Sequence, residues 1–353
     1  MEVSNLIKSG LSALTKPTRT RNAPLHLQVE PTSRCNLGCY FCSRLNSVKD
    51  GKGSDMLLEN FNSLLEDVKP LRVTFAGRGE PLLSPNLPKM IGLVKKNGAK
   101  SIVTTNFTVG DKYAEKLVSE HLDILRISID AATPQVYKKI RGRDFFERII
   151  RGIKTVNRAK KNNGSGHPSI GFEFVMTQDN IHQVKDVVLL AGELGIARIN
   201  FRPLGLVGIE DRKDMLMGLA SKDEFKRLLG RARVRSEDFG VKTNLDLLLK
   251  DINFYWNRYE NRLPPKPIGC LYLWLQIFVS AEGEVSPCCA LFMDEGVSMG
   301  NVFKNGFEAV WNGERFKEFR QQMKAGQVPY QSCKVCIPKD LTWVVKKIKL
   351  LKS

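Results

Sequence analysis

Short runs of β-branched residues alternate with amphipathic helical patterns from Leu25 to Pro203. The runs that predict strands cover residues 25–29, 71–76, 101–106, 124–130, 170–177 and 197–203. Apolar residues at helical spacing fill the stretches between them, and a further helix is expected from Ser221. Such alternation predicts a mostly parallel sheet with helical crossovers. Because six β–α units fall short of the eight of a closed barrel, we expect an α/β fold with a partial or open barrel.

The length of 353 residues predicts more than one domain, because a domain usually has about 100–200 residues. The β–α pattern changes after Pro203, and the sequence NRLPPKPIG at 261–269 has the composition of a linker, so we expect the domain boundary between Gly240 and Gly269. The expected parts are an N-terminal basic amphipathic segment (1–24), the partial barrel (25–240), a linker (241–268), a small cysteine-rich domain (269–338) and a basic amphipathic tail (339–353).

The chain is strongly basic, with 55 Lys and Arg against 37 Asp and Glu and a net charge of +18. This surplus favours an anionic partner, such as a membrane surface, a nucleic acid or an acidic substrate. An apolar fraction of 42% and a charged fraction of 26% are typical of a globular protein and exclude a disordered or collagen-like chain. No apolar run has the length of a signal peptide or a membrane span, so we expect a cytoplasmic location.

The eight cysteines fall into two clusters separated by a long stretch without any. In a reducing compartment, clustered cysteines bind metal more often than they form disulfides. The first cluster, Cys35, Cys39 and Cys42, directly follows the first expected strand, where parallel sheets place their chemistry. Three thiolates on a four-iron cluster leave one iron open to a further ligand. A zinc knot and three unrelated buried thiols are the alternatives, although no fourth Cys or His follows nearby to complete a zinc site.

The segment Cys35-Asn-Leu-Gly-Cys39-Tyr-Phe41-Cys42 resembles the cluster loop of the radical S-adenosylmethionine (SAM) superfamily, including the aromatic Phe41. The resemblance covers about residues 25–203 and implies a partial (β/α)6 barrel of the radical SAM type. It also implies a four-iron, four-sulfide (4Fe-4S) cluster whose open iron binds SAM, with Phe41 beside this cofactor.

The end of the second expected strand, Gly77-Arg78-Gly79-Glu80-Pro81, resembles the family segment that holds the methionyl amino group of SAM. Glycines let main-chain carbonyls approach an ammonium group closely, and Glu80 supplies negative charge. Arg78 stands between the two glycines as an insertion relative to the family pattern. The resemblance therefore implies that Gly77, Gly79 and Glu80 contact SAM.

Polar residues near the ends of later strands are further candidates for the SAM site. Asn106 follows the third strand, and Ser128 and Asp130 lie at the end of the fourth, where the resemblance implies contacts to the ribose and carboxylate of SAM. Ser128 and Asp130 are two residues apart, so strand alternation puts them on one face. Arg141 and Arg202 are candidate partners for the SAM carboxylate, and a solvated surface position is equally compatible with each.

The second cluster has the spacing Cys270-x17-Cys288-Cys289-x43-Cys333-x2-Cys336, and a hairpin is expected around Glu282-Gly283. This pattern resembles the SPASM domain, a C-terminal extension of some radical SAM enzymes that carries auxiliary iron–sulfur clusters. With five cysteines in place of the seven of the longer form, the resemblance implies one auxiliary 4Fe-4S cluster. Cys270, Cys288, Cys333 and Cys336 would saturate it, which favours electron transfer or structure over substrate binding. Cys289 is a spare buried thiol, a replacement for Cys288, or a proton or hydrogen donor near the substrate.

Both ends of the chain have amphipathic patterns. Leu6, Ile7, Leu11 and Leu14 have helical spacing, and we expect this N-terminal apolar face to pack on the protein's own surface, with an anionic bilayer as the alternative. The tail LTWVVKKIKLLKS sets Trp343 and aliphatic residues against four lysines, which suits an anionic bilayer as well as packing on the protein. A nucleic-acid partner is less favoured, because no RNA-binding module is recognisable. The tail thus predicts a cytoplasmic protein that can lie on the inner face of a membrane.

The resemblance implies an enzyme that receives an electron from a ferredoxin- or flavodoxin-type donor. It would cleave SAM to a 5′-deoxyadenosyl radical, which takes hydrogen from an unactivated C–H bond of the substrate. The basic tail favours a membrane lipid or another anionic substrate. The alternatives are a SPASM maturase that modifies a peptide or protein, a dehydrogenase of a small molecule such as a cyclitol or sugar, and a non-enzymatic two-cluster electron carrier. Apart from Cys289, no catalytic candidate is identified.

Overall fold

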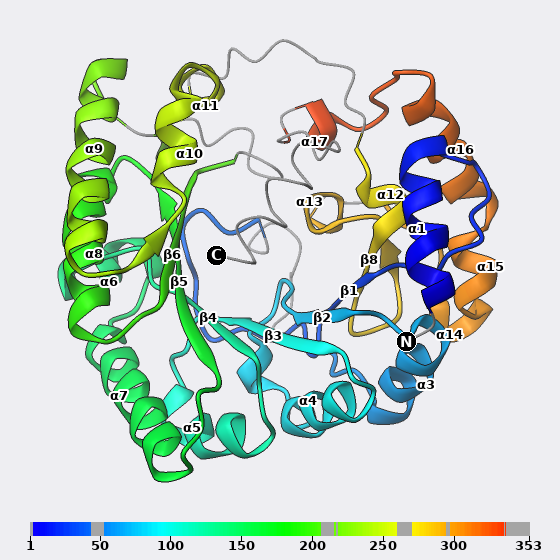
Figure 1. Cartoon of the computed structure of the whole chain (residues 1–353), viewed down its shortest axis with the longest axis horizontal. Coiled ribbons are helices and arrows are strands. Elements are labelled where there is room, and N and C mark those ends of the chain that lie inside the picture. Colours follow the sequence, from blue (N-terminus) through cyan, green and yellow to red (C-terminus); the bar gives the residue numbers. More distant parts are fainter. Residues whose placement is uncertain are drawn as a thin grey trace. The chain divides into compact units, whose positions relative to one another are not determined.

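The computed structural model describes residues 3–43, 53–205, 215–216, 218–259, 270–293, 297–334 and 336 (Figure 1). The chain folds into two compact units. The first contains Met1–Arg34, Ser47–Ser101 and Pro264–Ser353, and the second contains Cys35–Asn46 and Ile102–Leu263. Each unit therefore combines segments that are far apart in the sequence.

Parallel strands form the sheet of the second unit, in the order β3-β4-β5-β6-β7. These strands are β3 (Lys100–Thr105, from Ile102 in this unit), β4 (Ile124–Ser128), β5 (Ser169–Met176), β6 (Arg198–Pro203) and β7 (Lys242–Thr243). The helices are α5 (Gly110–Ser119), α6 (Pro134–Arg141), α7 (Phe146–Asn162), η2 (Ile181–Gln183), α8 (Val184–Glu193), α9 (Lys222–Asp238), α10 (Leu245–Lys250) and α11 (Ile252–Tyr259). Figure 1 shows α5, α7, α8 and α9 on one side of these strands.

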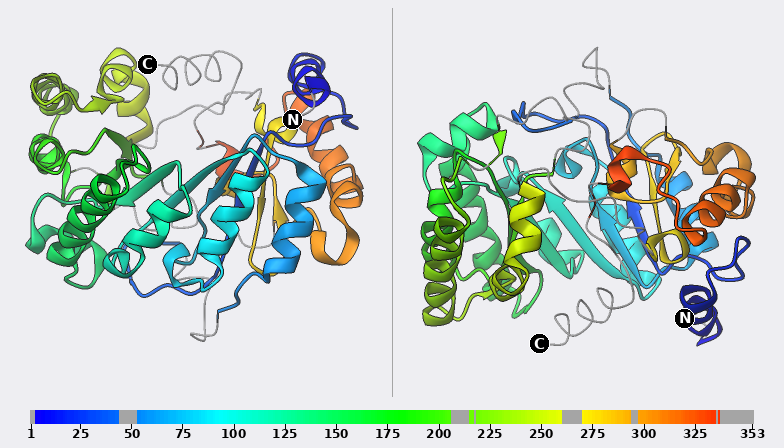
Figure 2. Two further views of the ribbon diagram at one scale, coloured as in Figure 1. Left: turned by 60° about the horizontal axis from the view of Figure 1, so that its bottom comes forward. Right: turned by 90° about the horizontal axis from the view of Figure 1, so that it is seen from above.

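The first unit combines the start of the β–α pattern with the C-terminal cysteine region. Strand β1 (His26–Val29) pairs in parallel with both β2 (Arg72–Phe75) and β8 (Gln276–Val279), and β9 (Val285–Ser286) pairs antiparallel to β8. The helices are α1 (Val3–Thr15), α3 (Leu58–Val68), η1 (Pro81–Leu83), α4 (Leu87–Lys96), α12 (Tyr272–Leu275), α13 (Cys289–Phe292), α14 (Val302–Asn305), α15 (Phe307–Trp311), α16 (Glu314–Lys324) and α17 (Gln331–Lys334). Figure 2 shows α3 and α4 on one side of the strands.

The strands of the second unit bury one face more deeply than the other. In β4, Leu125 and Ile127 are completely buried, whereas Arg126 on the opposite face is partly exposed. On the neighbouring strands Phe174 and Phe201 pack edge to face, with their ring centroids 5.6 Å apart. The apolar face forms the core, so the other face of the same strands is left to polar side chains.

The α/β fold and the six β–α units that the sequence predicts are confirmed. The helix expected from Ser221 is also confirmed, because Ser221 caps α9 and its Oγ accepts the Glu224 N–H at 3.2 Å. The region expected as a linker is partly wrong, since β7, α10 and α11 lie in it. Asn244 explains this difference: its side-chain amide bonds both the N–H and the carbonyl of Phe201, each at 2.8 Å, and so fixes β7 and α10 to β6.

The expected hairpin around Glu282-Gly283 is confirmed as β8 and β9, and Gly283 has a φ of +90°. This hairpin extends the sheet of the first unit, because β8 pairs with β1 over residues 276–279. The cysteine region therefore shares a compact unit with the N-terminal part of the chain. Within the described residues, none of the helices has both the length and the apolar composition needed to cross a bilayer. The expected tail, 339–353, lies outside the described residues.

Candidate functional site

The cysteine loop that follows β1 is fastened to the end of α6 through its main chain. The Tyr40 N–H donates to the Ile140 carbonyl at 3.1 Å, and the Cys42 N–H donates to the Cys39 carbonyl at 3.0 Å. Cys39 is buried, while Cys35 and Cys42 are half-buried. These main-chain bonds fix the part of the loop from Cys39 to Cys42.

A glycine closes α6 against this loop. Gly142 has a φ of +77°, and a Cβ atom there would stand 3.0 Å from the Gly38 carbonyl oxygen. A small pocket of about 390 Å³ opens at this contact and is lined by residues 35–38, Gly142 and Arg143. A larger residue than glycine at 142 would be strained by the backbone and would press on the loop.

Two side chains donate hydrogen bonds to sulfur atoms of the loop. Arg141 Nη1 lies 3.4 Å from Cys39 Sγ, and Asn106 Nδ2 lies 3.9 Å from Cys35 Sγ. Asn106 also donates to Asn36 Oδ1 at 3.0 Å, so the turn after β3 is joined to the loop. Hydrogen bonds and positive charge at sulfur favour the thiolate, which is the form that binds iron.

Arg141 forms a buried ion pair with Asp130. Asp130 has a φ of +49°, is completely buried, and accepts a further bond from the Val175 N–H at 2.6 Å. Burial raises the pKa of Asp130 above its usual value, although Arg141 opposes this shift. Burial alone would lower the pKa of Arg141, but Asp130 and Cys39 raise it above its usual value. The pair thus holds a guanidinium rigidly beside the sulfur of Cys39.

The expectation that Ser128 and Asp130 share one face rests on strand alternation, and β4 ends before Asp130. Strand β4 ends at Ser128, and the left-handed backbone of Asp130 breaks the alternation. Ser128 is half-buried, whereas the Asp130 carboxylate is occupied by Arg141 and Val175. In this structure Asp130 positions Arg141.

A second charged cluster, which the sequence analysis missed, lies on the polar face of β4, β5 and β6. Glu173 is 8% exposed and contacts Arg202, accepts a bond from Asn200 Nδ2 at 2.7 Å, and lies 3.7 Å from Arg126 Nε. Burial would raise the pKa of Glu173, but Arg202 and Arg126 lower it below its usual value. The sequence does offer a signal for this cluster, because Glu173 is a charged residue within the apolar run IGFEFVMT. Arg202, expected at the SAM carboxylate, is here bound to Glu173.

In the first unit, the glycine segment after β2 wraps around a buried carboxylate. Glu30 Oε1 accepts the N–H groups of Arg78 at 2.7 Å and Gly79 at 3.3 Å. A Cβ atom on Gly77 would stand 2.5 Å from Glu30 Oε1, and one on Gly79 would stand 2.0 Å from the Thr32 carbonyl oxygen. Burial raises the pKa of Glu30 above its usual value, although the main-chain hydrogen bonds act to lower this pKa. Only glycine fits either position, and Glu30 was not identified from the sequence.

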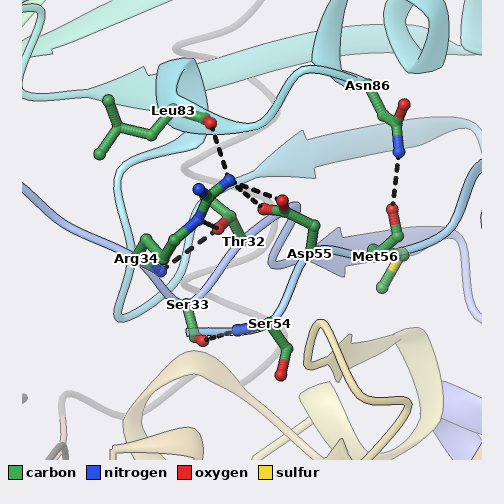
Figure 3. A network of polar contacts seen from close by, with 8 residues as sticks. All are labelled: Thr32, Ser33, Arg34, Ser54, Asp55, Met56, Leu83 and Asn86. Atoms are coloured by element: carbon green, nitrogen blue, oxygen red, sulfur yellow. Dashed lines mark hydrogen bonds and ion pairs between the residues drawn. The ribbon is translucent and has the colours of Figure 1, made fainter. Parts of the chain in front are cut away.

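Glu80 joins this segment to Arg34, whose side-chain contacts are drawn in Figure 3. Glu80 is buried, its Oε1 caps η1 by accepting the Leu82 N–H at 3.0 Å, and its own N–H donates to the Arg34 carbonyl at 2.7 Å. The Arg34 side chain binds Asp55 at 2.6 Å and the Leu83 carbonyl at 3.3 Å. Arg34 directly precedes Cys35, so this network holds the start of the cysteine loop.

The inserted Arg78 connects the glycine segment to the C-terminal cysteine region. Its Nη2 donates to the Phe292 carbonyl at 2.5 Å, and its guanidinium carbon lies 4.6 Å from the centre of the Phe292 ring. That ring stacks on Phe278 of β8, with centroids 3.8 Å apart. Phe292 ends α13, the helix that Cys288 caps. Arg78 therefore ties the expected SAM segment to the helix beside the second group of cysteines.

The C-terminal cysteines differ in exposure. Cys270, Cys288, Cys333 and Cys336 are half-buried, whereas Cys289 is exposed. Burial raises the pKa of Cys288 well above its usual value, and the nearby Cys289, Cys270 and Cys336 raise it further. Cys288 thus lies among the other expected ligands, while Cys289 begins α13 on its solvent side and is not the buried thiol that was considered.

The cysteines of both groups are suitable ligands for iron–sulfur clusters. Each group supplies thiol ligands, and the first group has donors placed at two of its sulfurs. Within the described ranges, no three His, Cys, Asp or Glu side chains lie close enough together to hold a single metal ion. A four-iron cluster takes each thiolate on a different iron, so its cysteines stand farther apart than the ligands of one zinc ion.

Comparisons with known proteins identify two regions of the chain. Residues 29–191 match the Radical SAM superfamily, and residues 270–337 match SPASM, an iron-sulfur cluster-binding domain. The first region contains the Cys35–Cys42 loop, the glycine segment and the Asp130–Arg141 pair. The second contains all five C-terminal cysteines.

Two relatives of this chain are peptide cyclases by name. The PqqA peptide cyclase of Xanthomonas campestris pv. campestris (strain 8004) is 26% identical over 330 residues, which is 91% of this chain and 81% of that protein. The PqqA peptide cyclase of Gluconobacter oxydans (strain 621H) is 25% identical over 331 residues, 91% of this chain and 84% of that protein.

Solved structures share the fold. Streptococcus suis SuiB bound to precursor peptide SuiA has a TM-score of 0.66 and 16% identity, covering 89% of this chain and 70% of that chain. Native anSMEcpe with bound AdoMet has a TM-score of 0.60 and 20% identity, covering 89% of this chain and 87% of that chain. At such identities the likeness is one of architecture.

Proposed function

Because this chain belongs to the radical SAM superfamily and carries a SPASM domain, we propose that it is a maturase that modifies a peptide. The observation that carries this proposal is the match to PqqA peptide cyclases over 91% of the chain, since it includes both domains at once. Peptide modification was an alternative in the sequence analysis, where a membrane lipid was the first expectation. The lipid expectation rests on the basic tail, outside the described residues, and stays a prediction. An inert electron carrier is not supported, because the chain is a radical SAM enzyme.

The radical SAM domain implies a 4Fe-4S cluster and SAM, and the SPASM domain implies an auxiliary cluster. We assign the first cluster to Cys35, Cys39 and Cys42, with the open iron for SAM. When bound, these groups supply the one-electron cleavage of SAM to a carbon radical that takes hydrogen from an unreactive C–H bond. The protein's own task is to orient SAM and the peptide and to exclude water.

Arg141 is the residue we assign to the SAM carboxylate. Its Nη1 and Nη2 are bound to Cys39 and Asp130, and its Nε is buried without a hydrogen-bond partner. A buried donor of this kind is costly unless a ligand completes its bonding, and a carboxylate suits a guanidinium. Asp130 holds the guanidinium in place and balances its charge. Phe41, whose ring centre lies 5.7 Å from the Arg141 guanidinium carbon, covers it from one side.

The remaining expected contacts receive roles from their surroundings. When SAM is bound, Gly77 and Gly79 would let main-chain groups approach its ammonium group, and Glu80 would supply a buried carboxylate there. Asn106 fixes Cys35 and the turn after β3. The contact of Ser128 with the ribose stays a prediction.

We assign the auxiliary cluster to Cys270, Cys288, Cys333 and Cys336. Forming a new bond between two peptide groups removes two electrons and two protons in all, so an electron acceptor is needed after the first hydrogen is taken. Four cysteine ligands leave no open iron, which suits electron acceptance better than substrate binding. The exposed Cys289 is left out of this ligand set. A ferredoxin- or flavodoxin-type donor and a cytoplasmic location remain predictions of this account.

The test is co-expression of the chain with the short open reading frames beside its gene, followed by mass spectrometry of each peptide. We expect one peptide to lose the mass of two hydrogens with the wild type and none to change with Cys39→Ala. Wild type that forms 5′-deoxyadenosine from SAM but oxidises a cyclitol or sugar, and no peptide, would support the small-molecule alternative instead.

A further inference from the structure

Helix α1 exposes its apolar face and buries its polar face, which is the opposite of an ordinary surface helix. Its four large apolar side chains are exposed: Leu6 by 47%, Ile7 by 59%, Leu11 by 56% and Leu14 by 69%. On the opposite side, Ser9 is 1% exposed and Ser12 is 5% exposed. We call the four exposed residues the α1 apolar stripe. The expectation that this face packs on the protein is wrong, because the serine face does so.

The stripe is the main concentration of exposed apolar side chains in the described part of the chain. Seven large apolar residues are exposed there, and four of them belong to α1. The others, Leu57, Val234 and Phe239, lie at or on different helices. Single exposed apolar residues are ordinary, but a contiguous group marks a surface that something covers.

The orientation of α1 is fixed by bonds from its polar side. Asn5 exchanges two hydrogen bonds with the main chain of Ala23, at 3.0 and 3.3 Å. Beyond the helix, Trp274 Nε1 donates to the Pro17 carbonyl at 2.8 Å, and Arg320 Nη1 donates to the Thr18 carbonyl at 3.2 Å. The helix also packs against α12. Figure 2 shows α1, in dark blue, at the edge of its unit.

The charged residues of α1 and of the segment directly after it are positive, while Asp67 and Glu308 line the cavity beside Leu6. Helix α1 contains Lys8 and no acidic residue, and Lys16, Arg19 and Arg21 follow directly after it. Lys8, Arg19 and Arg21 are exposed. The whole chain has a net charge of +18. An apolar strip with basic residues beside it is complementary to the surface of an anionic bilayer.

A second copy of the chain and a helical peptide fit the α1 apolar stripe less well than a membrane does. A second copy of the chain would bring the same lysines and arginines together across a two-fold axis, and one three-turn helix face is much smaller than the roughly 800 Å² per partner of a stable interface. A helical peptide needs a groove. The neighbouring cavity, about 1380 Å³, is lined by Leu6 but by no other member of the stripe.

We propose that α1 lies flat in the interface of an anionic membrane, with the α1 apolar stripe in the acyl boundary and Lys8, Lys16 and Arg19 among the headgroups. The contact is peripheral and reversible, because one short helix buries few side chains. It does not depend on the identity of the substrate, nor on the membrane contact that is predicted for the basic tail.

The test is co-sedimentation of the full-length, cluster-loaded protein with phosphatidylglycerol–phosphatidylcholine vesicles, beside vesicles of phosphatidylcholine alone. We expect wild type to bind the anionic vesicles, and Leu11→Ser/Leu14→Ser to bind them about tenfold or more weakly. The serine substitutions add no charge, so they remove only apolar contact. Val234→Ser is the matched control, since Val234 is 53% exposed on α9, and it should bind like wild type.

A second measurement places the helix directly. The tryptophan added in Leu14→Trp should increase quenching by brominated lipid over that of the wild type, and the one added in Val234→Trp should not. Equal vesicle binding by the wild type and the double serine variant would overturn the proposal, as would no binding by the wild type. A wild-type dimer that the double variant converts to a monomer, without vesicle binding by either, would assign the stripe to self-association instead.

Discussion

The Asp130–Arg141 ion pair is the best place to test the assigned SAM site. Its side chains are 0% and 8% exposed, and Asp130 also accepts the Val175 N–H. Asp130→Asn keeps the size of the side chain and an acceptor for Val175, but it leaves the Arg141 charge buried without a counter-charge. Breaking a buried pair from one side costs about 3–5 kcal/mol, and we expect a loss of unfolding free energy in this range.

Removing Arg141 instead of the Asp130 charge should cost less unfolding free energy. In Arg141→Met the remaining Asp130 carboxyl can take up a proton, because burial already raises its pKa. We expect a loss at or below the lower end of the same range, and a smaller loss at acidic pH. The double variant removes both charges, so its loss should fall short of the sum of the single losses by about 1–3 kcal/mol.

Urea unfolding of the cluster-free protein, followed by circular dichroism, gives the free energies for this cycle. Hydrogen exchange over β5 reports the same pair locally, since the Val175 amide is bonded to Asp130. Calorimetric titration with SAM should show weaker binding for both single variants of the loaded enzyme. The reasoning that the pair is buried and coupled would be refuted if each single variant lost less than about 1 kcal/mol of unfolding free energy and the double variant lost the sum of the two.

Three further outcomes are expected. Gly79→Ala places a Cβ atom 2.0 Å from a main-chain oxygen, so it should destabilise the fold by about 1–3 kcal/mol and abolish 5′-deoxyadenosine formation. The control is Gly230→Ala, because a Cβ atom at Gly230 has nothing within 4 Å. The melting temperature of this control should be unchanged or higher than that of the wild type. The pKa of Glu173 is lowered by Arg202, so its ionic contribution is present above the unfolded pKa and lost as pH falls through the folded value. The melting-temperature gap between wild type and Glu173→Gln should therefore narrow from pH 6 to pH 3, and a constant gap would contradict this. Cys288→Ala should halve the iron content from about eight to about four per chain, and Cys289→Ala should leave it unchanged.

Local features of the site could be predicted from the sequence. Cysteine spacing, glycines at a strand end and the Ser221 cap act over a few residues, and their positions follow from short stretches. The residues that were missed have distant partners. Glu30 binds main-chain groups 48 and 251 positions away, and no short pattern marks such a contact.

The orientation of α1 shows a different limit. The helical spacing of Leu6, Ile7, Leu11 and Leu14 predicts an amphipathic helix but does not say which face is covered. The covered face is set by Asn5 and by the segment after the helix, through bonds to Ala23 and to α12 and α16. The linker failed as a prediction for a similar reason, since Asn244 binds a strand 43 positions earlier.

The central claim is that the Cys35–Cys42 loop generates a radical that acts on a peptide. The most direct measurement is anaerobic incubation of the loaded enzyme with SAM, dithionite and the deuterated peptide identified by co-expression, followed by mass spectrometry of the 5′-deoxyadenosine. Deuterium should move from the peptide into 5′-deoxyadenosine with wild type, and Cys39→Ala should form no 5′-deoxyadenosine. Formation of 5′-deoxyadenosine without deuterium, from peptide deuterated at every carbon, would contradict the claim.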